Sequence, residues 1–125
     1  MKNFPYFYQA QIVRWVDGDT VELVLDKGFN DYFGRTDQPV SFRLLNVNAF
    51  EKYKPGGAEA TAFVNQLAPV GDWVIVRTYK INDKDNFGRY LATIYTDEIE
   101  FQAITGPTIS EALIAAGHGV PYIAK

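Results

Sequence analysis

The alternation of apolar and polar residues along the chain predicts most of its strands. The first two are expected in QIVRWV, a run of β-branched and aromatic residues, and in TVELVLD, where apolar positions alternate with mostly polar ones. In VSFRLLNV, Phe42 and Leu44 share one face of a strand, so Arg43 points to the other. Two later runs, DWVIVRTY and RYLATIY, predict two more strands.

Between these strands, two segments have the pattern of helices. AEATAFVNQLA has four apolar residues at helical spacing, namely Ala58, Ala62, Phe63 and Leu67. Pro69 and Gly71 end that helix. In the second segment, TISEALIAAG, Thr108 and Glu111 fit a capping box, and Gly117 stands where a helix-ending glycine belongs.

The resulting order of elements, β-β-β-α-β-β-α, is not the alternation of a parallel α/β fold. It predicts a mainly β protein with α-helices: a five-stranded Greek-key barrel of the OB type with two short helices packed outside it. Turn formers fill Lys27–Pro39, which reads as a long loop whose role stays open.

Composition sets the class of the protein. A chain of 125 residues with 47% hydrophobic content fits one domain over residues 1–125. It has no cysteine, which excludes disulfides and thiolate metal sites, and no apolar run approaches the roughly 18 residues needed to cross a membrane. The start, MKNFPYFYQAQ, lacks the apolar core of a signal peptide. We expect a cytoplasmic monomer; a secreted form whose leader has been removed stays open.

The net charge of −3 argues against binding nucleic acid by bulk electrostatics alone. The charge is uneven, however. Residues 1–40 carry six acidic and four basic side chains, whereas residues 41–90 carry five acidic and seven basic ones. An anionic partner is therefore expected at the second segment.

Four short motifs carry candidate chemistry. They are, in order, Asp17-Gly-Asp-Thr20, Phe42-Arg-Leu-Leu45, Asn48-Ala-Phe-Glu51 and Asp85-Asn-Phe-Gly-Arg89. Each alone is weak, since Asp-Gly between two strands is a common hairpin turn and an arginine in a strand usually snorkels.

Taken together and in this order, the motifs resemble the staphylococcal nuclease-like (thermonuclease) family. The matching segments are DGDTVEL, FRLLNVNAFE, GGAEATAFV, DNFGRYLATIY and EALIAAGHGVPY, which span nearly the whole chain from Ile12 to Tyr122. The resemblance implies an OB-fold nuclease that hydrolyses phosphodiester bonds in DNA, RNA or both with calcium. It leaves open which nucleic acid is preferred and whether cleavage is internal or from an end.

The resemblance also implies a role for each site residue. Calcium ligands would be Asp19, Asn48 and the backbone carbonyl of Ala49, all of them hard oxygen donors. Glu51 would be the general base, and Arg43 and Arg89 would contact the phosphate in its transition state. Four residues are candidates for binding the substrate: Lys52, Lys54, Phe87 and Tyr122. Asp17 and Thr20 would support the ligands, and Gly18 would let the chain bend so that Asp19 faces the site.

The chain also departs from the family pattern. Asn48 stands where the family has an aspartate, and Phe50 replaces a proline before Glu51. The first change removes a charge from the metal site, and the second removes a residue that stiffens the loop. The alternative is therefore a non-catalytic module on the same barrel that binds nucleic acid or a protein.

Two further features lie near the C-terminal end. The sequence runs to Lys125, and we expect the family's third helix to be absent. The single histidine, His118, is expected in a turn or at a strand edge rather than in catalysis.

Overall fold

The computed structural model describes residues 6–51, 53–79, 89–95 and 108–122. Within them the chain forms eight strands and two helices. In chain order they are β1 (Tyr6–Asp17), β2 (Thr20–Asp26), β3 (Tyr32–Phe33), β4 (Val40–Leu44), β5 (Val47–Ala49), α1 (Gly57–Leu67), β6 (Trp73–Thr78), β7 (Tyr90–Tyr95), α2 (Ile109–Ala115) and β8 (Gly119–Pro121). None of the helices in these residues is long and apolar enough to cross a bilayer.

Five of the strands close into a barrel. Neighbouring strands follow the order β1-β6-β7-β4-β2, and β1 pairs with β2 to complete the ring. All of these pairs are antiparallel except β4 and β7, which run parallel. The five-stranded barrel of the OB type predicted from the sequence is confirmed.

The interior of the barrel is filled by alternate residues of its strands. Phe42 and Leu44 are 1% exposed, so Arg43 between them lies on the outer face, as the alternation predicts. In β1 the pairing with β2 shifts between Ile12 and Arg14 and again between Trp15 and Asp17. Such irregularities change which face a residue meets.

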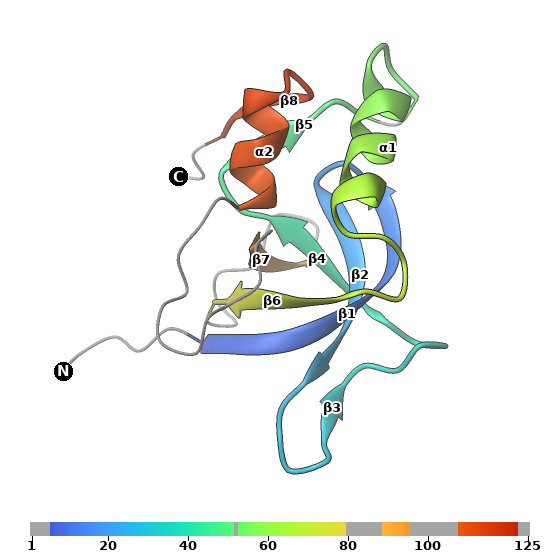
Figure 1. Cartoon of the computed structure of the whole chain (residues 1–125), viewed down its shortest axis with the longest axis vertical. Helices are drawn as coiled ribbons and strands as arrows, with labels where there is room; N and C mark the ends of the chain where they lie inside the picture. The colour runs from blue at the N-terminus through green and yellow to red at the C-terminus, as the bar shows by residue number, and fades with distance from the viewer. Residues whose placement is uncertain (1–5, 52, 80–88, 96–107, 123–125) are drawn as a thin grey trace, which may run out of the picture.

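Two helices cover one end of the barrel, and the β2–β3 hairpin lies at the opposite end (Figure 1). The cap of α2 is the predicted one: Thr108 and Glu111 form a capping box, and Gly117 has a φ of 78°. In α1 the predicted helix is confirmed, but the buried residues are Gly57, Ala60 and Val64.

Several expectations about local structure were incomplete. In α1, three of the four residues chosen for helical spacing, Ala58, Ala62 and Leu67, are exposed, because the helix turns a different face, that of Gly57, Ala60 and Val64, toward the core. The run VSFRLLNV is not one strand: it holds β4 and the first residue of β5, since Asn46 turns the chain between them with a φ of 68°. The predicted loop Lys27–Pro39 contains the two-residue strand β3, which pairs with β2.

Candidate functional site

The turn between β1 and β2 places Asp19 at the end of β4. The backbone N–H of Leu44 donates to the carbonyl of Asp19 at 2.8 Å. The φ of Gly18 is not positive, so the expected reason for this glycine, freedom to bend, is wrong. A Cβ at Gly18 would stand 2.8 Å from the Cβ of Ala49 and 3.2 Å from that of Ala60. The glycine is required because the turn packs tightly against β5 and α1.

The carboxylate of Asp19 lies at the centre of a network of polar contacts. Its Oδ2 accepts a hydrogen bond from the backbone N–H of Ala49 at 3.0 Å, and its Oδ1 accepts one from Thr20 Oγ1 at 3.2 Å. Arg43 Nη1 lies 3.5 Å from Oδ2. The side chains of Asp19 and Arg43 are only 15% and 12% exposed, so this ion pair is better shielded from water than a surface pair.

The guanidinium of Arg43 is fixed by several acceptors at once. Its Nη1 donates to the carbonyls of Leu44 at 2.9 Å and Val47 at 2.8 Å, and its Nη2 donates to Asn48 Oδ1. On another side, the ring of Tyr122 lies 5.6 Å from Arg43 Cζ, within cation–π range. A guanidinium held in this way presents its charge in one direction, at little further cost in conformational entropy when it binds an anion.

The second arginine reaches the same place from β7. Arg89 precedes β7, and its Nη1 donates to Thr20 Oγ1 at 2.8 Å. Thr20 is 4% exposed and in turn donates to Asp19, so its hydroxyl connects the arginine to the carboxylate. The parallel pairing of β4 with β7 sets Arg43 opposite Leu91 and so brings the two arginines to one end of the barrel.

The predicted calcium ligands also converge here. Asn48 and Ala49 belong to β5, one edge of which pairs with β8. The other edge faces Asp19, to which Ala49 donates its N–H. Because the N–H and C=O of one strand residue point to the same side, the Ala49 carbonyl faces that way too. One carboxylate, one amide oxygen and one carbonyl are a donor set that fits calcium, although a group of three or more acidic, histidine or cysteine side chains is absent from the described residues.

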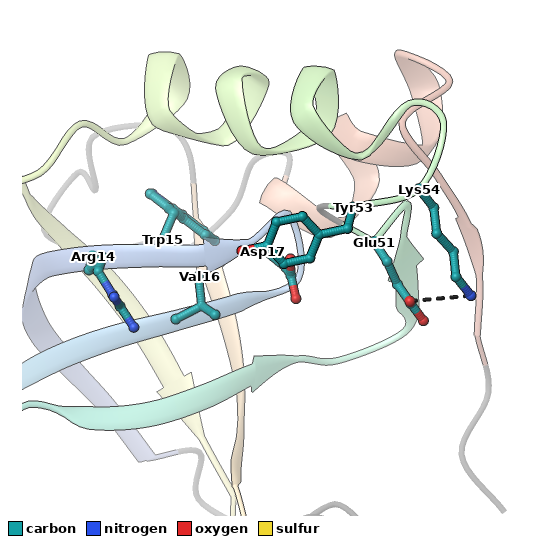
Figure 2. A pocket seen from close by; sticks show the side chains of 7 residues that line it. All are labelled: Arg14, Trp15, Val16, Asp17, Glu51, Tyr53 and Lys54. Atoms are coloured by element: carbon teal, nitrogen blue, oxygen red, sulfur yellow. Dashed lines mark ion pairs between the residues drawn. The ribbon is translucent and has the colours of Figure 1, made fainter.

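Glu51 lies two residues beyond this cluster, on the loop between β5 and α1. Its Oε2 pairs with Lys54 Nζ at 3.3 Å, and both side chains are more than two-thirds exposed. Glu51, Lys54 and Asp17 line one cleft of about 520 Å³ beside the end of β1 (Figure 2). The structure thus brings together Asp19, Thr20, Arg43, Asn48, Ala49 and Arg89, and sets Glu51 at the margin of that group.

The remaining predicted residues have different outcomes. Tyr122 lies against Arg43, as described above, whereas Lys52 and Phe87 lie outside the described residues. His118 stands in the turn before β8, with its ring centroid 4.8 Å from that of Phe63, and its carbonyl accepts from the N–H of Phe50. The expected position of His118 in a turn is confirmed.

Four residues of the cleft were not predicted from the sequence: Arg14, Trp15, Val16 and Tyr53. A signal for one of them was present, since Tyr53 stands between two lysines in Lys-Tyr-Lys, a basic and aromatic pattern typical of nucleic-acid contacts. Arg14, Trp15 and Val16 gave no such signal, because they stand within the run QIVRWV, whose pattern indicates only a strand.

The fold and the site together are those of a small closed barrel of the OB type with a carboxylate and two arginines at one end. The chain belongs to the family of staphylococcal nuclease homologues, whose profile matches residues 41–124. This membership supports a nuclease or a nucleic-acid-binding module. The chain is also similar to Protein ParB of Escherichia coli, with 26% identity over 117 residues that cover 91% of this chain and 57% of that protein. The chain therefore spans little more than half the length of that relative.

Proposed function

We propose that this protein is a calcium-dependent phosphodiesterase that hydrolyses DNA, RNA or both. The observation that carries the proposal is the meeting of Arg43, Arg89 and Asp19 at one end of the barrel, connected through Thr20. A phosphodiester gains negative charge on its oxygens as it reacts, and two fixed guanidiniums stabilise that charge because they form charge-assisted hydrogen bonds.

Calcium would be held by Asp19, Asn48 and the Ala49 carbonyl, and when bound it would polarise the phosphate and help to activate a water. In the described structure Asn48 Oδ1 and Asp19 Oδ2 both contact Arg43. A scissile phosphate that draws the guanidinium toward itself would release these oxygens to the cation. Binding of substrate and binding of metal should therefore support each other.

Glu51 would accept the proton of the attacking water. Phe50, in place of the family's proline, does not leave this loop without support: a Cβ at Gly56 would stand 2.7 Å from the Phe50 ring, so the ring packs directly on the start of α1. The backbone N–H of Lys54 also donates to the carbonyl of Glu51 at 3.0 Å. The Glu51–Lys54 ion pair is exposed and contributes little free energy, so it does not hold the carboxylate away from a substrate.

A second candidate is a nucleic-acid-binding module without catalysis. It is favoured by the contact of Arg43 with Asn48 Oδ1, since an asparagine used as an acceptor for arginine needs no metal. In that case the two arginines would bind a phosphate directly, and Asp19 would serve only to orient Arg43.

Cleavage of single-stranded DNA with calcium or with a chelator separates the two candidates. The expected result is calcium-dependent cleavage, lost in Glu51→Gln and in Arg89→Ala. Glu59→Gln is the matched control, because Glu59 lies in the first turn of α1 and is exposed. Binding of DNA without cleavage at millimolar calcium would exclude the enzyme and support the binding module without catalysis.

A further inference from the structure

The cleft that Glu51 lines also contains residues that the proposed mechanism does not use, among them Arg14 and Tyr53. Its volume of about 520 Å³ lies within the usual range of ligand sites, roughly 300–1,000 Å³. Arg14 lies at one end and Lys54 at the other, with Asp17 and Tyr53 between them (Figure 2). The cleft therefore has a cation at each end and an aromatic ring with a carboxylate in its middle.

Tyr53 is the most unusual residue of the cleft, since it is 93% exposed. An aromatic ring presented to water at that level offers a flat apolar surface, and every nucleobase has a complementary face. Arg14 is 64% exposed, and its Nε pairs with Glu22 at 2.9 Å. Such an exposed pair contributes little free energy, so it leaves the guanidinium available to a phosphate.

The position of the cleft relative to the two arginines indicates which part of a nucleic acid could bind in it. A nucleic acid strand continues on both sides of the bond to be cleaved. Tyr122 follows β8 at one edge of β5, and the β1–β2 turn with Asp17 lies at the other edge. The part of a nucleic acid chain that runs from the arginines past Glu51 would therefore enter the cleft. The part on the other side of the scissile bond would pass Tyr122.

Charge gives the orientation of the nucleotide within the cleft. The carboxylates of Asp17 and Glu51 repel phosphate, so the middle of the cleft suits a base and its sugar rather than the backbone. Arg14 lies three residues before Asp17 on a strand, about 10 Å away at roughly 3.3 Å per residue. It can thus meet the next phosphate along the chain.

We infer that this cleft is a second nucleotide subsite, in which Tyr53 stacks on a base and Arg14 contacts the following phosphate. The inference rests on the proposed hydrolysis of nucleic acid and deepens it. A nucleic acid chain that is held on both sides of the scissile bond is cleaved internally rather than from an end. Its ligand is single-stranded nucleic acid with at least one nucleotide on the Glu51 side.

The test measures the Kd of a fluorescently labelled single-stranded DNA octanucleotide, with chelator and with calcium, at several salt concentrations. Tyr53→Ala is expected to weaken binding about tenfold, within the range for loss of one stacked base, while Tyr53→Trp retains it. Arg14→Ala is expected to weaken binding and to lower the slope of log Kd against log salt by about one. Matched controls are Tyr32→Ala and Arg35→Ala on the β2–β4 connection, since both residues are exposed and Arg35 likewise pairs with a carboxylate.

The outcomes separate the subsite from the nuclease. If the octanucleotide binds and is cleaved, but Tyr53→Ala and Arg14→Ala behave like their controls, the subsite is wrong and the nuclease stands. If both variants weaken binding while the wild-type chain never cleaves, the subsite stands and the nuclease is wrong. A wild-type chain that binds no nucleic acid in either condition overturns both.

Discussion

The guanidinium of Arg43 donates a hydrogen bond to the side-chain oxygen of Asn48. This contact joins a residue proposed to bind phosphate to a residue proposed to bind calcium. The identity of residue 48 therefore affects both activities, and replacing its amide by a carboxylate is the most direct probe of the site.

Asn48→Asp is expected to tighten calcium binding by about tenfold or more, because it adds a second carboxylate to the ligand set. Isothermal titration calorimetry with calcium measures this. Asn46→Asp is the matched control, since it adds the same charge two residues earlier, in an exposed turn whose positive φ an aspartate tolerates. An unchanged affinity in Asn48→Asp would falsify the assignment of residue 48 as a ligand.

Calcium and nucleotide are expected to bind cooperatively. Arg43 pairs with Asp19, and Arg89 reaches it through Thr20, so a divalent cation that binds Asp19 alone would lie close to two guanidiniums. A phosphate between the arginines offsets their positive charge. Calcium affinity measured with saturating thymidine 5′-monophosphate should exceed the affinity measured without it, and removal of calcium should weaken nucleotide binding by the same factor. Equal calcium affinities with and without the nucleotide would contradict a shared site.

Thr20→Val is expected to lower kcat/KM by about 10–100-fold, the usual effect of removing a group that orients a catalytic residue. Valine has nearly the shape of threonine but cannot accept the hydrogen bond of Arg89 or donate one to Asp19. Thr20→Ser keeps the hydroxyl and should restore most of the activity. Loss of the folded state in Thr20→Val is checked by thermal unfolding; equal activity in both variants would show that the hydroxyl does not orient either residue.

Gly18→Ala is expected to destabilise the fold by about 1–3 kcal/mol, the usual effect of overpacking. The added Cβ would stand 2.8 Å from the Cβ of Ala49, so β5 must move away from the turn. That movement lengthens the bond from the Ala49 N–H to Asp19, now 3.0 Å, and should also weaken calcium binding.

The double variant Gly18→Ala/Ala49→Gly tests the origin of this effect. Removing the Ala49 methyl group makes room for the new one, so the double variant should regain part of the stability lost in Gly18→Ala, as measured by urea unfolding. Purely additive losses would mean that another contact of residue 18, such as that with Ala60, controls the packing.

Local sequence signals predicted the parts of the molecule that are locally determined. The capping box of Thr108 and Glu111 and the outward position of Arg43 each depend on neighbours within a few residues. The buried face of α1 could not be predicted in the same way, because Gly57, Ala60 and Val64 face inward only on account of how closely the helix lies against the barrel. Hydrophobicity alone favours Leu67, which is 39% exposed.

The sequence indicated which residues belong to the site but not how they contact one another. The motifs indicated Asp19, Arg43 and Arg89, yet the role of Thr20 as the connection between Arg89 and Asp19 follows only from the three-dimensional contacts. The cleft with Tyr53 was missed for a similar reason. Its walls come from β1 and from the loop before α1, two segments that are distant in sequence.

The parallel pairing of β4 with β7 also has a consequence for how the protein folds. Arg43 and Arg89 are far apart in the chain, and no hairpin joins their strands. Contacts of such long range form late in folding, because a large loop must close before they gain any free energy. A partly synthesised or partly folded chain therefore lacks the paired arginines, so the phosphate site proposed for them exists only when the barrel is complete.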